Sequence, residues 1–379
     1  MRARSATLGL ILCPIFGLIG SLPAAAQATA RIGLSAPLTG PDAAFGQGLR
    51  LGAEQAVADL NRAGPQRFAL TVADDGGDPR QAGAIAARFA TDGISMVVGP
   101  FESAAVAAAA AAGERAGTVV IAPGATYGPL TGRGLWNLFR LGTGDPQQGR
   151  AAADYLAKAF AGRPVAIVSD QTTFGRSLAD AVAGRLHELD RREAVFEGID
   201  RGTRDFGPLV ARLSAAKVAA VYFGGLGPDA AGLVRAMREA RLGATLVASD
   251  GILGAAFAAL GPAGEGTVMT MPPDPPRLPE GRAPRPPRSP EADAVATGAY
   301  AAVQLFAQAL DRGRALDGRT GRVDGRKLAQ ALHDGGFKTV LGPVAFDGRG
   351  DLSGGAVVLR VWRRMPDGRL DYAGQEPPS

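Results

Sequence analysis

Cysteine and histidine are almost absent from this chain of 379 residues. Cys13 is the single cysteine, and His187 and His333 are the two histidines. A lone cysteine forms no internal disulfide, and so few histidines argue against zinc sites and Cys–His chemistry. The sequence also lacks the Gly-x-Ser-x-Gly nucleophile motif, and its glycine-rich run GGLGPDAAG lacks the spacing and the lysine of nucleotide loops. We therefore expect a protein that is not an enzyme and that needs no metal and no cofactor.

Concentrated charge is absent as well. The 41 lysines and arginines are scattered among 36 acidic residues, with no basic block and no stripe of basic and aromatic residues. We therefore expect no nucleic acid as a partner. Hydrophobic residues make up 46% of the chain, but after residue 28 no stretch is long and apolar enough to cross a bilayer. The composition is that of a globular protein, and the length suits two domains.

Residues 1–28 have the pattern of a secretory signal peptide. Two arginines begin the segment, an apolar run follows at 8–19, and small residues at 24–28 offer a cleavage site. An uncleaved anchor is the alternative, which we disfavour because the run is shorter than the roughly 20 residues that span a bilayer. A lipid-modified Cys13 is also disfavoured, because no small residue precedes it. We expect export to the periplasm.

Short apolar strands alternate with amphipathic helical stretches through most of the chain. The pattern predicts strands at about 31–35 and 68–73, with a helix at about 46–63 between them. A second series of strands and helices begins near Asp145 and ends near Met271. Strands that alternate with helices predict parallel sheets with right-handed crossovers. The expected fold class is therefore α/β, with two doubly wound parallel-sheet lobes.

Residues 272–290, with the sequence PPDPPRLPEGRAPRPPRSP, interrupt this pattern. Proline lacks an N–H and fixes φ, so the segment cannot be a helix or a central strand. We interpret it as a surface loop or a connection between the lobes, and a polyproline docking motif is the alternative. Helices at about 293–311 and 326–334 follow, and the tail contains two predicted strands, VLGPVAFD and GAVVLRVW.

Polar side chains follow several of the predicted strands. Ser103 begins an alanine-rich helix, where its hydroxyl and the free N–H groups of the helix end suit a carboxylate. Thr126 follows Pro123-Gly124-Ala125 and offers a hydroxyl acceptor, and Asp250 ends a later strand and could neutralise an ammonium group. The plainer alternatives are an N-cap serine, a loop threonine and a helix cap. Because parallel sheets bind ligands beyond the carboxyl ends of their strands, we expect a site for an α-amino acid.

Apolar side chains occur in the same set of loops. Phe45, Phe101, Phe174 and Leu226 predict a pocket for an apolar ligand side chain. Packing in the core or at a rim is the alternative for each of them, and we favour it for Phe101.

Three aspartates, Asp74, Asp75 and Asp78, cluster in a loop with two glycines. A calcium or paired-carboxylate site is conceivable there. We favour a turn followed by a helix cap, because Asp78 precedes Pro79 at a predicted helix start.

At these residues the chain resembles the branched-chain amino-acid binding proteins of bacterial ABC importers, the leucine/isoleucine/valine-type periplasmic receptors. The resemblance extends from about Arg31 to Trp362. It rests on five stretches, PLTGPDAAFGQGLRLGAEQAVADLN, DDGGDPRQA, IAPGATYGPLTGRG, AAVYFGGLGPDAAGLVRAMREARLG and LGPVAFDGRGDL.

The resemblance implies roles for individual residues. Ser103 would hold the substrate carboxylate, and Gly124, through its carbonyl, and Thr126 would hold the ammonium group. Asp250 would complete the ammonium site. The aromatic residues of the family's pocket match Phe45 and Phe174.

The chain departs from the family pattern at several positions. Leu226 and Val295 stand where family members have aromatic residues, and Phe174 lacks the hydroxyl of the family's tyrosine. Gly77 and Glu102 stand where close relatives have a disulfide. Leucine, isoleucine or valine, a larger aromatic acid, a small amide and a modified amino acid all stay open as ligands.

The resemblance also implies the type I periplasmic binding protein architecture, with a hinge of three crossovers. One lobe is expected at 29–144 plus 272–343, and the other at 145–271 plus 344–379. The expected partners are a small-molecule ligand and an inner-membrane ABC permease, and the receptor is expected to be a monomer. The alternative function is a periplasmic sensor or regulatory scaffold that kept the fold and lost transport.

Overall fold

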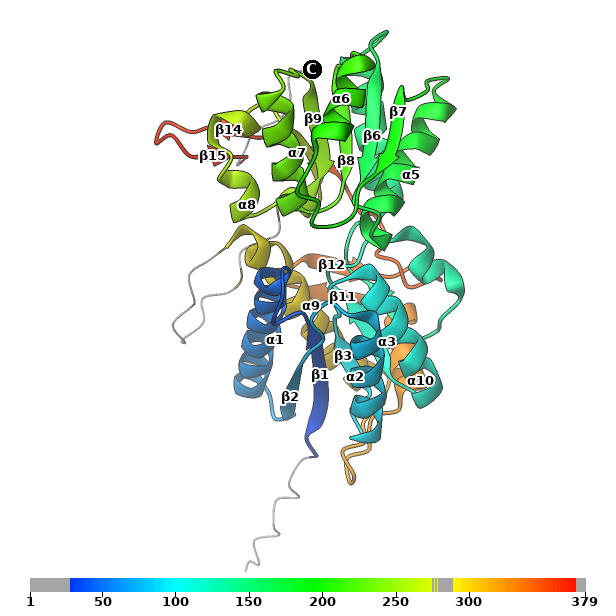
Figure 1. The fold of residues 1–379 in the computed structure, drawn as a ribbon. Helices are drawn as coiled ribbons and strands as arrows, with labels where there is room; N and C mark the ends of the chain where they lie inside the picture. Colours follow the sequence, from blue (N-terminus) through cyan, green and yellow to red (C-terminus); the bar gives the residue numbers. More distant parts are fainter. Residues whose placement is uncertain (1–27, 275, 277, 279–288, 373–379) are drawn as a thin grey trace, which may run out of the picture.

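The computed structural model describes residues 28–274, 276, 278 and 289–372. Two α/β lobes lie one above the other (Figure 1). Residues 1–27 of the predicted signal peptide lie outside the described residues, as does most of the proline-rich segment at 272–290. The predicted fold class is confirmed, because both lobes contain a doubly wound, mainly parallel sheet.

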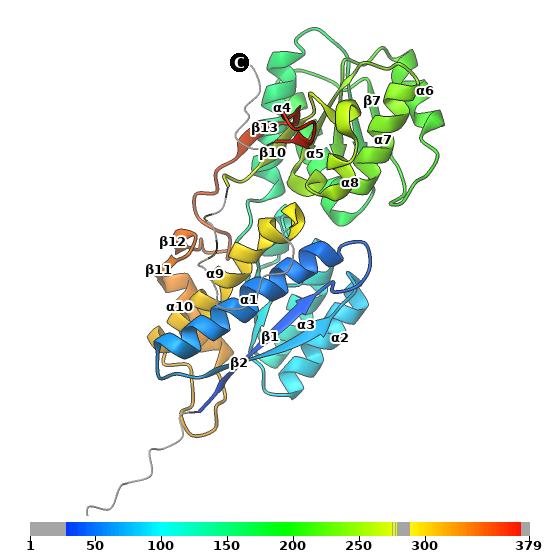
Figure 2. The ribbon, with the colours of Figure 1, turned by 90° about the vertical axis from the view of Figure 1, so that its left-hand side faces the viewer.

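The first lobe contains a parallel five-stranded sheet in the order β2-β1-β3-β4-β5. Its strands are β1 (Ala30–Ala36), β2 (Phe68–Asp74), β3 (Met96–Val98), β4 (Val119–Ala122) and β5 (Leu138–Arg140). The other elements of this lobe are α1 (Ala43–Ala63), α2 (Pro79–Thr91), α3 (Ser103–Ala116), η1 (Gly128–Arg133), α9 (Pro290–Arg312), α10 (Gly325–Asp334) and the hairpin β11 (Gly336–Thr339) and β12 (Gly342–Ala345). Helices α2 and α3 pack on one face of the sheet, and α1 and α9 pack on the other (Figure 2).

Helices α1 and α9 approach each other closely because glycine replaces a side chain at their contact. A Cβ added to Gly52 would lie 2.0 Å from the carbonyl oxygen of Ala296. The buried face of α1 carries Leu49 and Ala53, which belong to the core of the first lobe. This contact places the start of α9 beside the carboxyl ends of the strands.

The second lobe contains a six-stranded sheet in the order β13-β10-β9-β8-β6-β7. Its strands are β6 (Val165–Ser169), β7 (Val195–Gly198), β8 (Ala220–Gly224), β9 (Thr245–Ser249), β10 (Val268–Met271) and the antiparallel β13 (Val358–Val361). Its helices are α4 (Asp145–Ala159), α5 (Thr173–Glu188), α6 (Gly207–Ala215), α7 (Gly227–Glu239), η2 (Asp250–Ile252), α8 (Ala255–Ala258) and η3 (Gly261–Gly264). The short pair β14 (Arg363–Arg364) and β15 (Leu370–Asp371) packs beside η3. Helices α4 and α5 cover one face of the sheet, and α6 and α7 cover the other.

Three segments of the chain cross between the lobes, after β5, after β10 and before β13. Figure 2 shows the third one, between β12 and β13, along one side of the molecule. Val344 and Phe346 belong to the core of the first lobe, and Leu352 packs against that core. The exact division into lobes stays a prediction, and this burial favours a third crossover at 353–357 rather than at the predicted 343–344.

Candidate ligand-binding site

A cavity of about 100 Å³ lies between the two lobes. A cavity needs at least ~10–15 Å³ to hold one water molecule, so this one suits a ligand of several non-hydrogen atoms. All seven residues singled out from the sequence line it, namely Phe45, Ser103, Gly124 and Thr126 from the first lobe and Phe174, Leu226 and Asp250 from the second. The structure therefore brings the predicted site residues together, and their binding roles stay predictions.

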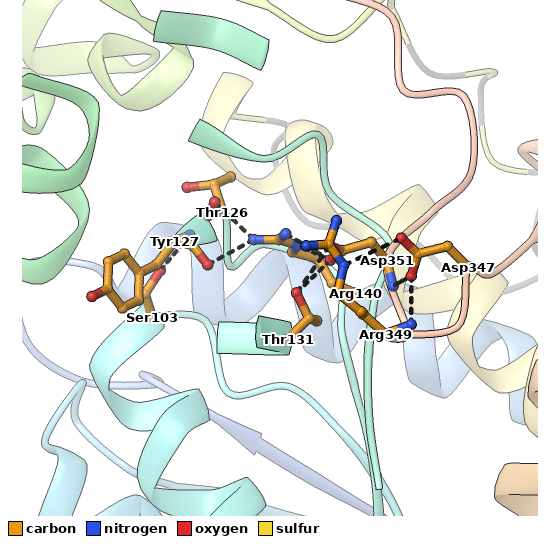
Figure 3. Close-up of polar contacts among 8 residues, drawn as sticks. All are labelled: Ser103, Thr126, Tyr127, Thr131, Arg140, Asp347, Arg349 and Asp351. Atoms are coloured by element: carbon orange, nitrogen blue, oxygen red, sulfur yellow. Dashed lines mark hydrogen bonds and ion pairs between the residues drawn. The ribbon is translucent and has the colours of Figure 1, made fainter. Parts of the chain in front are cut away.

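Ser103 is the first residue of α3, and residues 99–102 connect it to the carboxyl end of β3. The N-cap position belongs to Glu102, whose side chain makes no capping hydrogen bond. The Ser103 hydroxyl instead accepts a hydrogen bond from the backbone N–H of Tyr127, at 3.4 Å (Figure 3). An N-cap role for Ser103 is therefore not observed, and the hydroxyl lies at the cavity wall beside the start of α3.

Thr126 belongs to a turn that a buried arginine holds in place. Nη1 of Arg140 donates to the carbonyl oxygens of Thr126 and Tyr127, at 2.8 Å each (Figure 3). The N–H of Asp145 donates to the same Thr126 carbonyl, also at 2.8 Å. The hydroxyl of Thr126 is buried and has no hydrogen-bond partner among the described residues. The oxygen of this hydroxyl is therefore free to accept a further hydrogen bond, and Thr126 is one of the residues that line the cavity.

The same arginine ties this turn to the segment that precedes the third crossover. Nε of Arg140 donates to Asp351 at 2.9 Å, and Nη2 lies 2.6 Å from the same carboxylate. Thr131 also donates to Asp351, and Asp347 accepts the N–H groups of Arg349 and Asp351 (Figure 3). The arginine side chain is only 5% exposed. Because the ion pair is buried and hydrogen-bonded, removing one partner would leave a costly unpaired charge.

Asp250 is the first residue of η2, directly after β9. Gln148 Nε2 donates to Asp250 Oδ1 at 3.0 Å, and Thr270 donates to Gln148 Oε1 at 2.8 Å. The side chain of Ser249 accepts a hydrogen bond from the N–H of Gly251 and so caps the start of η2. The carboxylate of Asp250 is therefore not the cap of this helix. Burial raises the pKa of Asp250 to about 6. A positively charged ligand group beside Asp250 would favour the ionised carboxylate, so it would lower this pKa and bind favourably.

Aromatic and aliphatic side chains form the rest of the cavity wall. Phe45 and Phe101 are stacked, with ring centroids 4.4 Å apart and an interplanar angle of 13°. A Cβ added to Gly124 would lie 2.7 Å from the Phe101 ring, so the ring fits only against glycine. Phe101 both packs against a neighbouring ring and lines the cavity, so packing alone does not describe it. Phe174 also lines the cavity, in contact with the turn at Gly251.

An ion-pair cluster joins the lobes next to the cavity, and sequence reasoning missed it. Arg201, in the loop after β7, donates to Asp42 at 2.7 and 2.8 Å and to Glu102 at 3.1 Å. Burial and the neighbouring Asp42 raise the pKa of Glu102 to about 8, and Arg201 opposes that shift. The two acids precede α1 and α3, and 159 positions separate Asp42 from Arg201, so no local pattern indicates the contact.

The aspartate loop after β2 has the predicted turn and cap role. Asp78 accepts from the N–H of Gln81 at the start of α2, and Asp74 accepts from the N–H of Leu38. Asp75 accepts from the Ser35 hydroxyl at 2.7 Å. Within the described residues, no group of three or more His, Cys, Asp or Glu side chains is arranged to hold a metal ion.

The two histidines make local contacts. His187 lies 2.9 Å from Glu193, and His333 lies 3.3 Å from the carbonyl oxygen of Asp347. Neither histidine lines the cavity. In the described part of the chain, no helix has both the length and the apolar character that crossing a membrane requires.

Comparisons with known proteins match this architecture. A family model described as a periplasmic binding protein matches residues 29–361. The Leu/Ile/Val-binding protein homolog 1 of Brucella melitensis biotype 1 is 36% identical over 375 residues, which cover 97% of this chain and 98% of that protein. Two solved structures extend the comparison to three dimensions.

An ABC transporter substrate-binding protein from Desulfitobacterium hafniense, in complex with Leu, has a TM-score of 0.69 at 26% identity. The match covers 91% of this chain and 99% of that one. A solute-binding protein of an ABC transporter from Rhodopseudomonas palustris HaA2, in complex with p-hydroxybenzoic acid, has a TM-score of 0.76 at 18% identity. That match covers 92% of this chain and 96% of the other. The chain therefore belongs to the periplasmic binding protein family, and its fold is that of the type I members.

Proposed function

We propose that the mature protein is the periplasmic receptor of an ABC importer and that it binds an amino acid between its lobes. One observation carries this proposal. Ser103 and Thr126 from the first lobe and Asp250 from the second line one cavity, and the hydroxyl of Thr126 has no hydrogen-bond partner among the described residues. The named relatives of the chain, which are Leu/Ile/Val-binding and ABC substrate-binding proteins, support the same function.

The polar groups suit the two charges of an amino acid at opposite ends. Ser103 and the N-terminus of α3 offer an O–H, free N–H groups and the positive end of a helix dipole to the carboxylate. The carbonyl of Gly124, the hydroxyl of Thr126 and the carboxylate of Asp250 offer acceptors to the ammonium group. Since Asp250 belongs to the second lobe, an ammonium held on the first lobe would draw the lobes together.

The apolar wall suits a ligand side chain without charge. Phe101 and Val295 come from the first lobe, and Phe174, Leu226 and Leu253 come from the second. Burying such a side chain would contribute about 1.5–3 kcal/mol for a group of the size of leucine or phenylalanine. We therefore propose an aliphatic or aromatic amino acid rather than an acidic or basic one.

Transport would depend on the closed arrangement of the lobes. Only this arrangement lets the ligand contact both lobes, so the ligand shifts the population towards it. We propose that a membrane permease binds the closed form, that the receptor acts as a monomer, and that residues 1–28 direct export and are removed.

Isothermal titration calorimetry of the mature protein tests the proposal. The titrants are the common amino acids, together with benzoate and 4-hydroxybenzoate. We expect an aliphatic or aromatic amino acid to bind, and Asp250→Asn to weaken its binding by about 2–5 kcal/mol because an ammonium group loses its buried partner. Asp180→Asn, at an exposed position on the same lobe, is the matched control. Binding of the aromatic acids alone, or equal affinity in Asp250→Asn, would contradict the assignment.

A further inference from the structure

One arginine faces several acids where the two lobes meet beside the cavity. Arg201 of the second lobe donates to Asp42 and Glu102 of the first lobe. Asp170 and Asp229 of the second lobe are close enough for the charge of Arg201 to act on them as well. Contact between the lobes therefore gathers more acidic groups than a single guanidinium can balance.

The two acids of the first lobe approach the same point. A Cβ added to Gly77 would lie 3.6 Å from Glu102 Cγ and 3.8 Å from Asp42 Oδ2. Nη2 of Arg201 donates to both oxygens of Asp42, and Nη1 donates to Oε1 of Glu102 at 3.1 Å. The second oxygen of Glu102, Oε2, is left to carry a proton, and a protonated carboxyl can donate to a neighbouring carboxylate.

The surroundings of Glu102 favour its neutral form. Burial and the adjacent Asp42 raise the pKa of Glu102 to about 8, although Arg201 acts in the opposite direction. The N-terminus of α3 also favours an ionised acid, but the Glu102 side chain makes no capping hydrogen bond there. Two like charges in a largely buried place are unfavourable, so one of the two acids takes up a proton.

The cavity gives Glu102 a further reason to be neutral. Glu102 and Ser103 are neighbours in the chain, and both line the cavity. The ligand carboxylate is proposed to bind at Ser103, where an ionised Glu102 would repel it. When the lobes separate, water replaces the contact with the second lobe, and the pKa of Glu102 returns towards its ordinary value. Ligand binding and closure therefore both favour protonation of Glu102.

We propose that Arg201, Asp42 and Glu102 form a proton-linked latch, so that closure of the lobes over the ligand takes up one proton from solvent. The proton goes to Oε2 of Glu102, which then donates to Asp42, while Asp42 stays ionised and paired with Arg201. This inference rests on the proposed function and adds a co-bound proton to it. The latch makes closure dependent on pH as well as on the ligand.

The sign of the pH effect follows from the two forms. The closed form holds the Glu102 proton more tightly than the open form, so affinity falls as the pH rises from about 5 to about 8. With a closed-form pKa of about 8 and an ordinary open-form value, uptake is about 0.8 proton at pH about 7.5 and about 0.2 at pH about 8.5.

Other buried acids near the cavity contribute little in this pH range or are separated by mutation. Burial raises the pKa values of Asp145 and Asp250 to about 6, so both are largely ionised above pH about 7. Burial also raises the pKa values of Asp170 and Asp229, against the charge of Arg201. A variant of Glu102 is therefore needed to assign the proton.

Isothermal titration calorimetry in phosphate and in Tris at pH about 7.5 and about 8.5 tests the latch. The two buffers differ in ionisation enthalpy, so the difference in observed heat gives the number of protons taken up. The probe is the common amino acid that the wild type binds most tightly. We expect Glu102→Gln to lose the uptake and to bind about 10-fold or more tightly at pH about 7.5, because the amide resembles the protonated acid. Glu54→Gln, at an exposed position on the same lobe, is the control and should keep the uptake.

Each outcome decides the question. Loss of proton uptake in Glu102→Gln, with binding that is equal or tighter, supports the latch. No uptake by the wild type, uptake that persists in Glu102→Gln, or weaker binding by this variant overturns it, while the receptor function stands. If the wild type binds none of the common amino acids, the proposed function fails and this inference fails with it.

Discussion

Replacing Arg201 by methionine should weaken ligand binding, although Arg201 itself does not line the cavity. Arg201 belongs to the second lobe, and its two partners, Asp42 and Glu102, belong to the first. The side chain of Arg201 is 32% exposed, whereas those of Asp42 and Glu102 are 7% and 14% exposed. The cluster therefore acts across the interface between the lobes, and opening the lobes would break it.

The magnitude follows from this partial burial. A fully exposed ion pair contributes about 0–1 kcal/mol, and removing one partner of a fully buried pair costs about 3–5 kcal/mol. Arg201 lies between these limits, so we expect the closed form to lose about 1–2 kcal/mol, which is roughly a 5- to 30-fold increase in Kd. Methionine keeps most of the apolar stem of arginine and removes its charge.

Stopped-flow fluorescence and calorimetry with the bound amino acid measure the effect. We expect the dissociation rate to account for most of the change, because the cluster forms only on closure. Added salt should weaken the wild type more than the variant. Arg204→Met, at an exposed position in the same loop after β7 and outside the ion-pair cluster, is the control. An unchanged Kd and an unchanged salt dependence in Arg201→Met would show that the cluster does not hold the lobes together.

Three further predictions concern the framework of the site. Arg140→Met should destabilise the fold by about 3–5 kcal/mol in urea unfolding, because the partly buried Asp351 and the carbonyls of Thr126 and Tyr127 lose their shared partner; a loss below 1 kcal/mol would contradict this role. Gly124→Ala should abolish amino-acid binding in calorimetry, since the new Cβ would lie 2.7 Å from the Phe101 ring, and retained affinity would mean that the ring moves freely. The ligand-free protein should gain stability as the pH falls from about 7 to about 5, because a carboxyl with a folded pKa of about 6 takes up a proton in the folded state first. Asp145→Asn should reduce that gain in thermal unfolding, and an unchanged gain would assign it to other groups.

The sequence predicted the fold, and the residues it singled out line one cavity, because both follow from local patterns. Alternation of strands and helices predicts parallel sheets, and the carboxyl ends of such strands meet at one edge. Ser103, Thr126 and Asp250 each lie within a few residues of the carboxyl end of a strand, and all three line the same cavity. Their identity as hydroxyls and an acid was enough to suggest an amino acid.

The missed residues depend on contacts between distant parts of the chain. Asp145 has the sequence pattern of an ordinary acid in the first turn of a helix, and its burial beside Thr126 arises only when the crossover folds back. Arg140 is separated from Asp351 by 211 positions, and Asp42 is separated from Arg201 by 159. The predicted third crossover precedes the one that the burial of Phe346 favours, because the strand pattern around β12 does not indicate which core buries this side chain.

A crystal structure of the mature protein with its bound amino acid tests the central claim most directly. The claim predicts the ligand carboxylate at Ser103 and the start of α3, with the ammonium group within hydrogen-bonding distance of Thr126 Oγ1 and of the Asp250 carboxylate. A ligand bound with its carboxylate at Asp250 or outside the cavity between the lobes would contradict it.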